Sequence, residues 1–286
     1  MTAAIDFRVR LPNELRPAAV PPPEHTSQYD AVLDVSATRD RTLAQLREDM
    51  AAAGVQRAVV HAEYEFGDPA DELNEAVAQV VAGDPAAFAG FGTLSLDPLR
   101  IRRTLGQVAR IHELGLAGVN IQPSFFGLPM TDPRLYPAYA RCEELGLVVC
   151  LHTGVNYTTV YPIANDHPLQ LDDVACQFPD LVLVACHAGW PWAAELAAVM
   201  RKHPNVHADF GGLAPRYVGE DGTGWSVMRR FMDSLLTGQV LFATDWPVFG
   251  MQRALAEWRA MGLKPQTLGR LLGGNAEALL AAAGRR

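Results

Sequence analysis

Two histidines and one aspartate, His152, His187 and Asp245, are the residues of this sequence best placed to do chemistry together. Each stands at the end of a short apolar run and is followed by a small residue or a turn. Two imidazoles and a carboxylate from separate strands can bind a divalent metal ion that keeps open positions, or act as acid–base groups around a substrate. A single buried histidine is more often a core residue than a ligand, but three such positions together predict a common site.

The elements that must position these residues are eight short runs rich in valine, isoleucine and leucine, separated by segments with helical spacing. These runs predict strands over residues 3–9, 55–61, 88–95, 117–122, 147–153, 181–188, 206–210 and 240–244. Near-continuous apolar strands that alternate with helices indicate a parallel sheet covered on both faces. We therefore predict an α/β protein with one domain over residues 1–286, a single (β/α)8 barrel of the TIM type.

An open, doubly wound sheet is the alternative arrangement of the same elements. The chain has neither a Gly-x-Gly-x-x-Gly sequence after a strand nor a phosphate loop ending in Gly-Lys-Ser or Gly-Lys-Thr. Eight strand–helix units in 286 residues also favour a closed barrel.

The residues that follow the strands of such a barrel face the mouth, where barrel enzymes do their chemistry. Several of these segments are long, and the segment 11–36 is predicted to form a lid or a contact with another subunit. The loops carry aromatic residues, so we expect a largely apolar mouth with a polar floor. Asn120 and Trp190 are predicted to bind substrate there. Other polar residues at strand ends are weaker candidates: His61, Glu63, Gln122, His207 and Asp209.

Composition and charge restrict the partners of the protein. The net charge is -8 and no basic stripe is visible, so a nucleic-acid partner is not expected. The four cysteines form no Cys-x-x-Cys pair, and no signal peptide or membrane-spanning run is visible. We predict a cytoplasmic protein that acts on a small molecule, without a membrane partner, and the sequence leaves open whether it is a homo-oligomer.

Several motifs resemble the amidohydrolase superfamily, in the "amidohydrolase 2" branch that includes aminocarboxymuconate semialdehyde decarboxylase. The motifs are Ile-Asp-Phe-Arg-Val-Arg at 5–10, Leu-His-Thr-Gly at 151–154, Cys-His-Ala-Gly at 186–189, Ala-Thr-Asp-Trp-Pro at 243–247 and Gly-Asn-Ala-Glu-Ala-Leu-Leu at 274–280. The resemblance implies a barrel of the metal-dependent hydrolase type. It also implies hydrolysis or decarboxylation of small, often aromatic or dicarboxylic, molecules, usually with one zinc ion.

The sequence departs from this family at the end of the first strand. The family has His-x-His there, two metal ligands, whereas this chain has Arg8 and Arg10. Arginine stays protonated and has no lone pair to offer, and its charge repels a nearby cation. His152, His187 and Asp245 remain as a reduced ligand set. The expected cofactor is therefore either none or one divalent metal ion, with zinc the first choice.

Without a metal, the same residues suggest another arrangement. Arg8 and Arg10 could bind a substrate carboxylate through paired hydrogen bonds or stabilise negative charge in the transition state. Asp245 could pair with one arginine and stay ionised as a general base, while His152 and His187 transfer protons. The alternative is that the arginines and Asp245 form an inert salt-bridge cluster.

We predict a hydrolase that cleaves an amide, ester or lactone in a small carboxylated substrate, with Asp245 activating water. The alternatives are a decarboxylase of the same family and a catalytically inactive ligand-binding barrel. Hydrolysis ranks before decarboxylation because a carboxylate that is bound tightly by cations is stabilised in its ground state.

Overall fold

Eight parallel strands in sequential order form the centre of the computed structural model, which describes residues 3–16, 23–34, 41–63 and 69–283. The strands are β1 (Ala4–Arg10), β2 (Val55–His61), β3 (Phe88–Thr93), β4 (Gly118–Ile121), β5 (Val148–Leu151), β6 (Leu183–Ala185), β7 (Val206–Asp209) and β8 (Val240–Leu241). Each strand pairs with the next in parallel. The predicted (β/α)8 barrel is confirmed, and every predicted strand is present.

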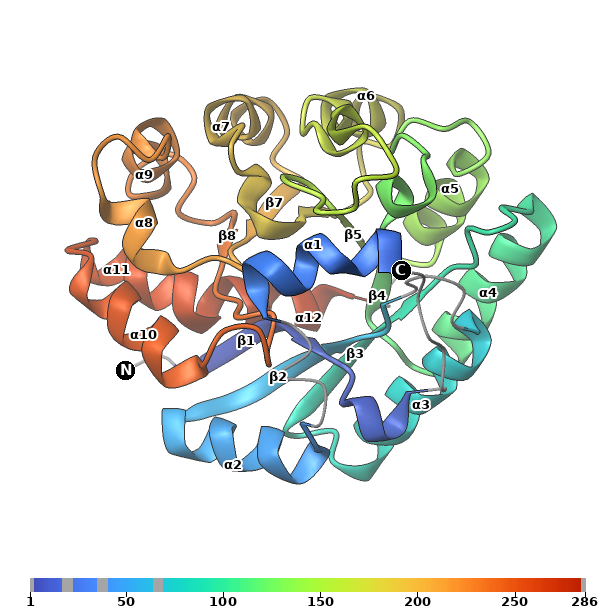
Figure 1. Cartoon of the computed structure of the whole chain (residues 1–286), viewed down its shortest axis with the longest axis horizontal. Coiled ribbons are helices and arrows are strands. Elements are labelled where there is room, and N and C mark those ends of the chain that lie inside the picture. The colour runs from blue at the N-terminus through green and yellow to red at the C-terminus, as the bar shows by residue number, and fades with distance from the viewer. Residues whose placement is uncertain (1–2, 17–22, 35–40, 64–68, 284–286) are drawn as a thin grey trace.

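Helices surround the strands (Figure 1). They are α1 (Pro23–Leu33), α2 (Leu43–Ala53), α3 (Ala70–Gly83), α4 (Ile101–Glu113), α5 (Tyr136–Glu144), α6 (Gln170–Gln177), α7 (Ala193–Lys202), α8 (Pro215–Gly219), α9 (Ser226–Met232), α10 (Met251–Ala260), α11 (Pro265–Gly269) and α12 (Asn275–Ala282). Within the described ranges, no helix has the length and apolar character needed to cross a membrane.

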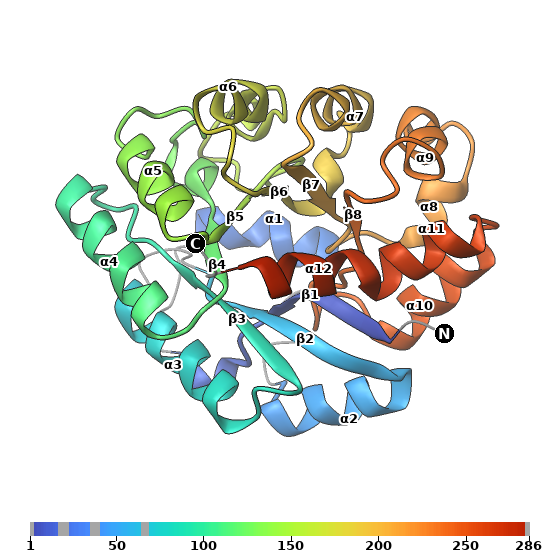
Figure 2. The same cartoon turned by 180° about the vertical axis from the view of Figure 1, so that it is seen from behind.

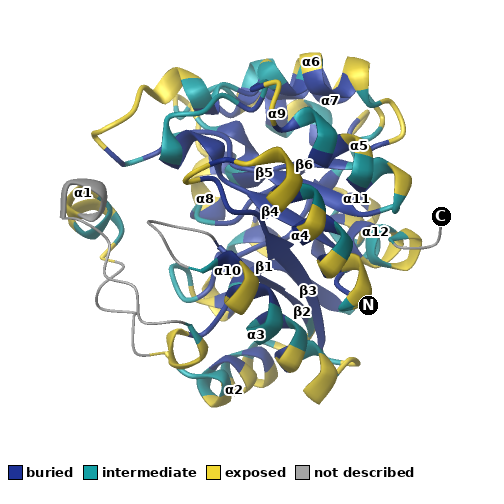
Figure 3. Cartoon of the chain, turned by 90° about the vertical axis from the view of Figure 1, so that its right-hand side faces the viewer, coloured by how far each residue is buried: buried dark blue, intermediate teal, exposed yellow. Residues whose placement is uncertain are grey.

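The two ends of the barrel are covered differently. Helix α12 lies across one end, as Figure 2 shows, and it contains residues 275–280 of the last sequence motif. Helix α1 lies across the opposite end, and the side view of Figure 3 shows it beyond the ends of the strands on that side. It belongs to the predicted segment 11–36, of which residues 17–22 and 35–36 lie outside the described residues.

The strands that precede His187 and Asp245 end earlier than the apolar runs that predicted them. Strands β6 and β8 stop at Ala185 and Leu241, so His187 and Asp245 lie in the turns that follow. Both residues have left-handed backbone conformations, with φ of 58° and 57°. A strand cannot continue through such a residue, because extended backbone requires negative φ.

A β-bulge in β1 decides which of its side chains face the interior. The pairing with β2 shifts between Asp6 and Val9, so that β1 has one extra residue there. Ile5, before the bulge, and Phe7, within it, belong to the apolar cluster inside the barrel, whereas Val9 packs in the layer between strands and helices. An extra residue reverses the alternation of side chains. Arg8 and Arg10 therefore both point inward.

The seam between β8 and β1 is closed by backbone and side-chain hydrogen bonds. The amide of Phe7 donates to the carbonyl of Phe242 (2.9 Å), and the amide of Arg10 donates to that of Trp246 (2.9 Å). The buried carboxylate of Asp6 accepts from the Thr244 amide (3.0 Å) and the Thr244 hydroxyl (2.6 Å). Asp6 thereby fixes the residue that precedes Asp245. Burial raises the pKa of Asp6 to about 7.

Asp6 is expected to make the stability of the protein depend on pH. Its pKa of about 7 in the folded chain lies above the ordinary value of 3.8. Its stabilising effect is therefore full below pH 3.8, declines as the pH rises, and is lost above about 7. Asp6→Asn keeps an acceptor and a donor at this position but does not titrate. The free energy of unfolding of the wild type minus that of Asp6→Asn should fall between pH 4 and 7 in urea titrations.

Other titrating groups are common to both proteins, so they cancel in this difference. Asp6→Ala serves as the reference for lost hydrogen bonds. Its stability should lie roughly 2–5 kcal/mol below that of Asp6→Asn at any pH in this range, because buried donors lose their acceptor and neither variant titrates at this position. A difference between wild type and Asp6→Asn that stays constant from pH 4 to 7 would contradict the proposed titration.

Candidate active site

A pocket opens at the end of the barrel that α1 covers. It encloses about 510 Å³ of space, open mouth included. Its walls are apolar or aromatic and comprise Tyr29, Leu33, Phe125, Val155, Tyr157, Trp190, Gly212 and Leu213. Its polar residues are Arg10, Gln122, His152, His187 and Asp245. The expected apolar mouth with a polar floor is thus present. Five residues predicted to form the site line this pocket together: Arg10, His152, His187, Trp190 and Asp245.

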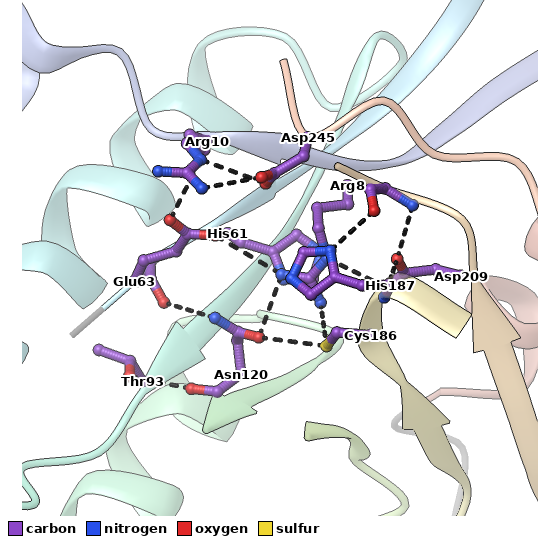
Figure 4. Close-up of polar contacts among 12 residues, drawn as sticks. Arg8, Arg10, His61, Glu63, Thr93, Asn120, Cys186, His187, Asp209 and Asp245 are labelled. Atoms are coloured by element: carbon purple, nitrogen blue, oxygen red, sulfur yellow. Dashed lines mark hydrogen bonds and ion pairs between the residues drawn. The ribbon is translucent and has the colours of Figure 1, made fainter. Parts of the chain in front are cut away.

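Arg10 and Asp245 form a paired contact on the pocket floor (Figure 4). The guanidinium Nε lies 3.2 Å from Oδ1 of Asp245, and Nη2 lies 2.8 Å from Oδ2. Burial alone would raise the pKa of Asp245, but the charge and hydrogen bonds of Arg10, together with the nearby His187 and Arg8, outweigh burial and hold this pKa below its ordinary value. Asp245 is therefore ionised at neutral pH.

Arg8 lies beneath the pocket and does not line it. Its guanidinium donates to Asp209 (Nε to Oδ2, 3.0 Å), to Asn120 (Nη1 to Oδ1, 3.2 Å) and to Cys186 (Nη2 to Sγ, 2.6 Å), and its Nη1 is 3.6 Å from Oε1 of Glu63. These contacts stabilise a buried charge that would otherwise be very costly. Arg8 and Asn120 were predicted to contact substrate; that role stays a prediction, because both side chains are buried below the pocket floor.

His187 is held in a defined tautomer by the turn after β6. Its Nδ1 lies 2.7 Å from the carbonyl oxygen of Gly211, which can only accept, so Nδ1 carries the proton and Nε2 is an acceptor. Burial and the neighbouring His152 lower the pKa of His187 to about 4, so the ring is neutral at pH 7. The Asp209 carboxylate also accepts from the backbone amide of His187 (3.3 Å), and so connects this turn to Arg8.

His152 is paired with an aspartate that was missed in the sequence. Its Nδ1 lies 2.5 Å from Oδ1 of Asp166, and both side chains are buried. A carboxylate at this position orients the ring and leaves Nε2 as the acceptor. The rings of His152 and His187 are 4.9 Å apart between centroids. Asp166 lies 14 residues after His152 in a loop without periodicity, so no local pattern pointed to it.

Gln122 presents an unused acceptor at the pocket wall. It follows β4, and its Oε1 is buried without a hydrogen-bond partner. A buried amide oxygen without a donor is costly unless a ligand or water supplies one. Gln122 was a weaker candidate in the sequence, and its position favours a role in binding a substrate that carries an N–H or O–H group.

The other strand-end residues have structural contacts. His61 packs against Phe91, and its Nε2 contacts the carbonyl of Phe7 at 2.9 Å. Glu63 forms ion pairs with both arginines, at 3.6 Å from Arg8 and 3.5 Å from Arg10. These residues support the floor of the pocket.

The predicted ligand set does not fit a divalent metal ion. In the described part of the chain, one group of three potential ligand side chains has all its ligand atoms within 4.8 Å of one another, and it does not include His152, His187 or Asp245. Both carboxylate oxygens of Asp245 are engaged by Arg10. A divalent ion would have to displace this guanidinium and remain close to its positive charge, which is unfavourable.

Comparison with known proteins identifies relatives of the chain. A sequence model of the amidohydrolase family matches residues 5–281. A 2-amino-3-carboxymuconate-6-semialdehyde decarboxylase from Dictyostelium discoideum is 39% identical over 87 residues, which are 30% of this chain and 23% of that protein. The chain is thus aligned with about a quarter of the length of this curated relative.

Solved structures share the fold over the whole chain. An uncharacterised TIM-barrel protein from Bordetella bronchiseptica has a TM-score of 0.82 and 29% identity, covering 99% of both chains. A 5-carboxyvanillate decarboxylase from Sphingomonas paucimobilis has a TM-score of 0.73 and 16% identity, covering 99% of this chain and 100% of that one. A probable 2-pyrone-4,6-dicarboxylic acid hydrolase from Acinetobacter baumannii has a TM-score of 0.69 and 13% identity, covering 98% and 99%.

Removal of Arg8 should destabilise the protein through the acids that surround it. Arg8→Met leaves Asp209 buried without its cation, and the expected loss in the free energy of unfolding is about 3–5 kcal/mol. The double variant Arg8→Met with Asp209→Asn removes the unpaired charge and should recover at least about 1 kcal/mol of this loss. Urea unfolding of the three proteins measures both effects. Equal stability of the single and double variants would show that the Arg8–Asp209 pair does not balance this charge.

Proposed function

The chain belongs to the amidohydrolase family, and we propose that it hydrolyses an amide, ester or lactone bond in a small substrate that carries a carboxylate. Members of this family are hydrolases or decarboxylases. The observation that carries the proposal is the pocket floor, where Arg10 and the ionised Asp245 lie beside the neutral His187 and beside His152. This set can bind an anion and move protons.

Arg10 is the residue proposed to bind the substrate carboxylate. Its side chain is 15% exposed and lines the pocket, whereas that of Arg8 is 1% exposed. A carboxylate that shares the Arg10 guanidinium weakens the contact between Arg10 and Asp245. The pKa of Asp245 then rises toward its ordinary value, because an opposite charge no longer holds it down. Substrate binding would thereby make Asp245 a stronger base.

The proposed reaction uses one proton transfer in each direction. Asp245 takes a proton from water as the water oxygen attacks the carbonyl carbon of the substrate. Asp245 then returns this proton to the leaving nitrogen or oxygen as the C–N or C–O bond breaks. The second O–H of this water donates to Nε2 of His187 or of His152, and this hydrogen bond orients the water for attack. Asp166 is proposed to hold His152 in position.

Decarboxylation is the second candidate. It is supported by the curated relative, which is a decarboxylase, and by the aromatic wall that includes Phe125 and Trp190. An apolar environment favours decarboxylation, because the negative charge of the carboxylate becomes delocalised in the substrate as carbon dioxide leaves. Arg10 acts in the opposite direction, because it stabilises the carboxylate in the ground state. Hydrolysis therefore remains the first candidate, and an inactive ligand-binding barrel is the third.

Helix α1 is proposed to close the pocket over the bound substrate. It contributes Tyr29 and Leu33 to the pocket wall. The ring of Tyr29 packs on Phe125 at 5.8 Å and on Tyr157 at 5.4 Å between centroids. A helix that carries part of the wall can exclude water from the reacting groups.

Asp245→Asn is expected to abolish turnover and leave the fold intact. Screening a panel of small lactones, esters and amides that carry a free carboxylate, together with aromatic carboxylic acids, identifies a substrate and separates hydrolysis from carbon dioxide release. With that substrate, kcat should fall by roughly 10²–10⁴-fold, because the general base is lost. Asp173→Asn, an exposed acid on α6, is the matched control and should keep full activity. Unchanged turnover by Asp245→Asn would show that the assigned base is wrong.

Chelator treatment is expected to leave this activity unchanged. The guanidinium of Arg10 occupies both oxygens of Asp245, so turnover should not require a divalent ion in the pocket. The value of kcat/KM before and after dialysis against a chelator, and after addition of zinc or manganese, should agree within about twofold. Loss of activity on dialysis with recovery by either metal would contradict a metal-independent site.

A further inference from the structure

Three side chains that can bind a metal ion meet on the outer layer of helices, away from the pocket. Asp172 and Cys176 lie one turn apart on α6, and His203 follows the last residue of α7. A spacing of four residues places Asp172 and Cys176 on the same face of the helix. One ligand atom from each of the three residues lies within 4.8 Å of the others, and no other group in the described ranges meets this condition. None of the three lines the pocket.

This cluster already holds a positive charge. The ammonium of Lys202 lies 2.7 Å from Oδ1 of Asp172 and 3.7 Å from Sγ of Cys176. His203 Nε2 lies 2.6 Å from Oδ1 of Asp172 and 4.0 Å from the same sulfur. The Lys202 side chain is 55% exposed on a flexible stem, so it can turn into solvent at small cost. The groups that remain are a carboxylate, a thiol and an imidazole.

We propose that Asp172, Cys176 and His203 bind a divalent transition-metal ion, with zinc the preferred ion, and that Lys202 gives way to it. Sulfur, nitrogen and carboxylate oxygen are the ligands that zinc binds in proteins. Bonds of about 2.0–2.3 Å in a tetrahedral site separate neighbouring ligand atoms by about 3.3–3.8 Å. The separations in the cluster require only small side-chain rotations to reach this range. Water can take the fourth position, because Cys176 is exposed.

The bound ion would act on stability and not on the reaction. It would join α6 to α7, the helices that precede and follow β6 along the chain. Binding deprotonates the Cys176 thiol and releases the proton to solvent. Affinity should therefore increase with pH. A ligand that binds the folded chain alone raises its melting temperature.

Cobalt titration of the full-length, metal-free protein tests the proposal, because a cobalt–thiolate bond gives a near-ultraviolet charge-transfer band. The wild type should show this band with one equivalent of cobalt, and zinc should abolish it by replacement. Cys176→Ser should lose the band and bind zinc at least tenfold more weakly by calorimetry. Asp173→Asn, which makes the same change of charge as Asp172→Asn one residue away on α6, should keep the band and the affinity.

Lys202→Gln distinguishes a specific metal site from incidental binding of metal ions to surface side chains. Removal of the competing ammonium should tighten zinc binding several-fold, whereas Asp172→Asn and His203→Ala should weaken it. Circular dichroism of the metal-free variants confirms that each is folded. A wild type without the thiolate band, a band that survives Cys176→Ser, or equal affinities for Asp172→Asn and Asp173→Asn would overturn the proposal. Enzymatic activity is not part of the readout, so this site and the proposed hydrolysis succeed or fail separately.

Discussion

The buried guanidinium of Arg8 is the constraint on which the rest of the site depends. A charge enclosed in a barrel is tolerated only where opposite charges and acceptors surround it. Asp209 at the end of β7 and Glu63 after β2 supply the charges, and Asn120 supplies an acceptor. Because Asp209 also holds the amide of His187, the same interaction sets the position of one imidazole in the pocket.

Arg8 is buried below the pocket floor, so Arg10 is the arginine of β1 that lines the pocket. Arg10, two residues further along β1, binds both oxygens of Asp245. A guanidinium is a delocalised cation that binds carboxylates through paired hydrogen bonds. The carbonyl of Gly211 and the carboxylate of Asp166 set the tautomers of the two histidines, and the proposed chemistry of this pocket is proton transfer.

The Arg10–Asp245 and Lys202–Asp172 ion pairs differ in burial. In the pocket, the Arg10 side chain is 15% exposed and the Asp245 side chain is 2% exposed. On the outer helices, the Lys202 side chain is 55% exposed, so solvent can accommodate its ammonium. The charges of the pocket pair therefore cost more to separate than those of the surface pair.

Local periodicity in the sequence predicts the eight strand–helix units and the barrel that they form. The rule that residues after parallel strands meet at one end predicts that His152, His187, Asp245, Arg10 and Trp190 lie at its mouth. Three features appear only in the folded chain: a bulge turns Arg8 and Arg10 inward, Arg8 lies below the floor, and Asp166 pairs with His152. Bulges and charge pairs depend on contacts between distant segments, and no spacing along the chain records them.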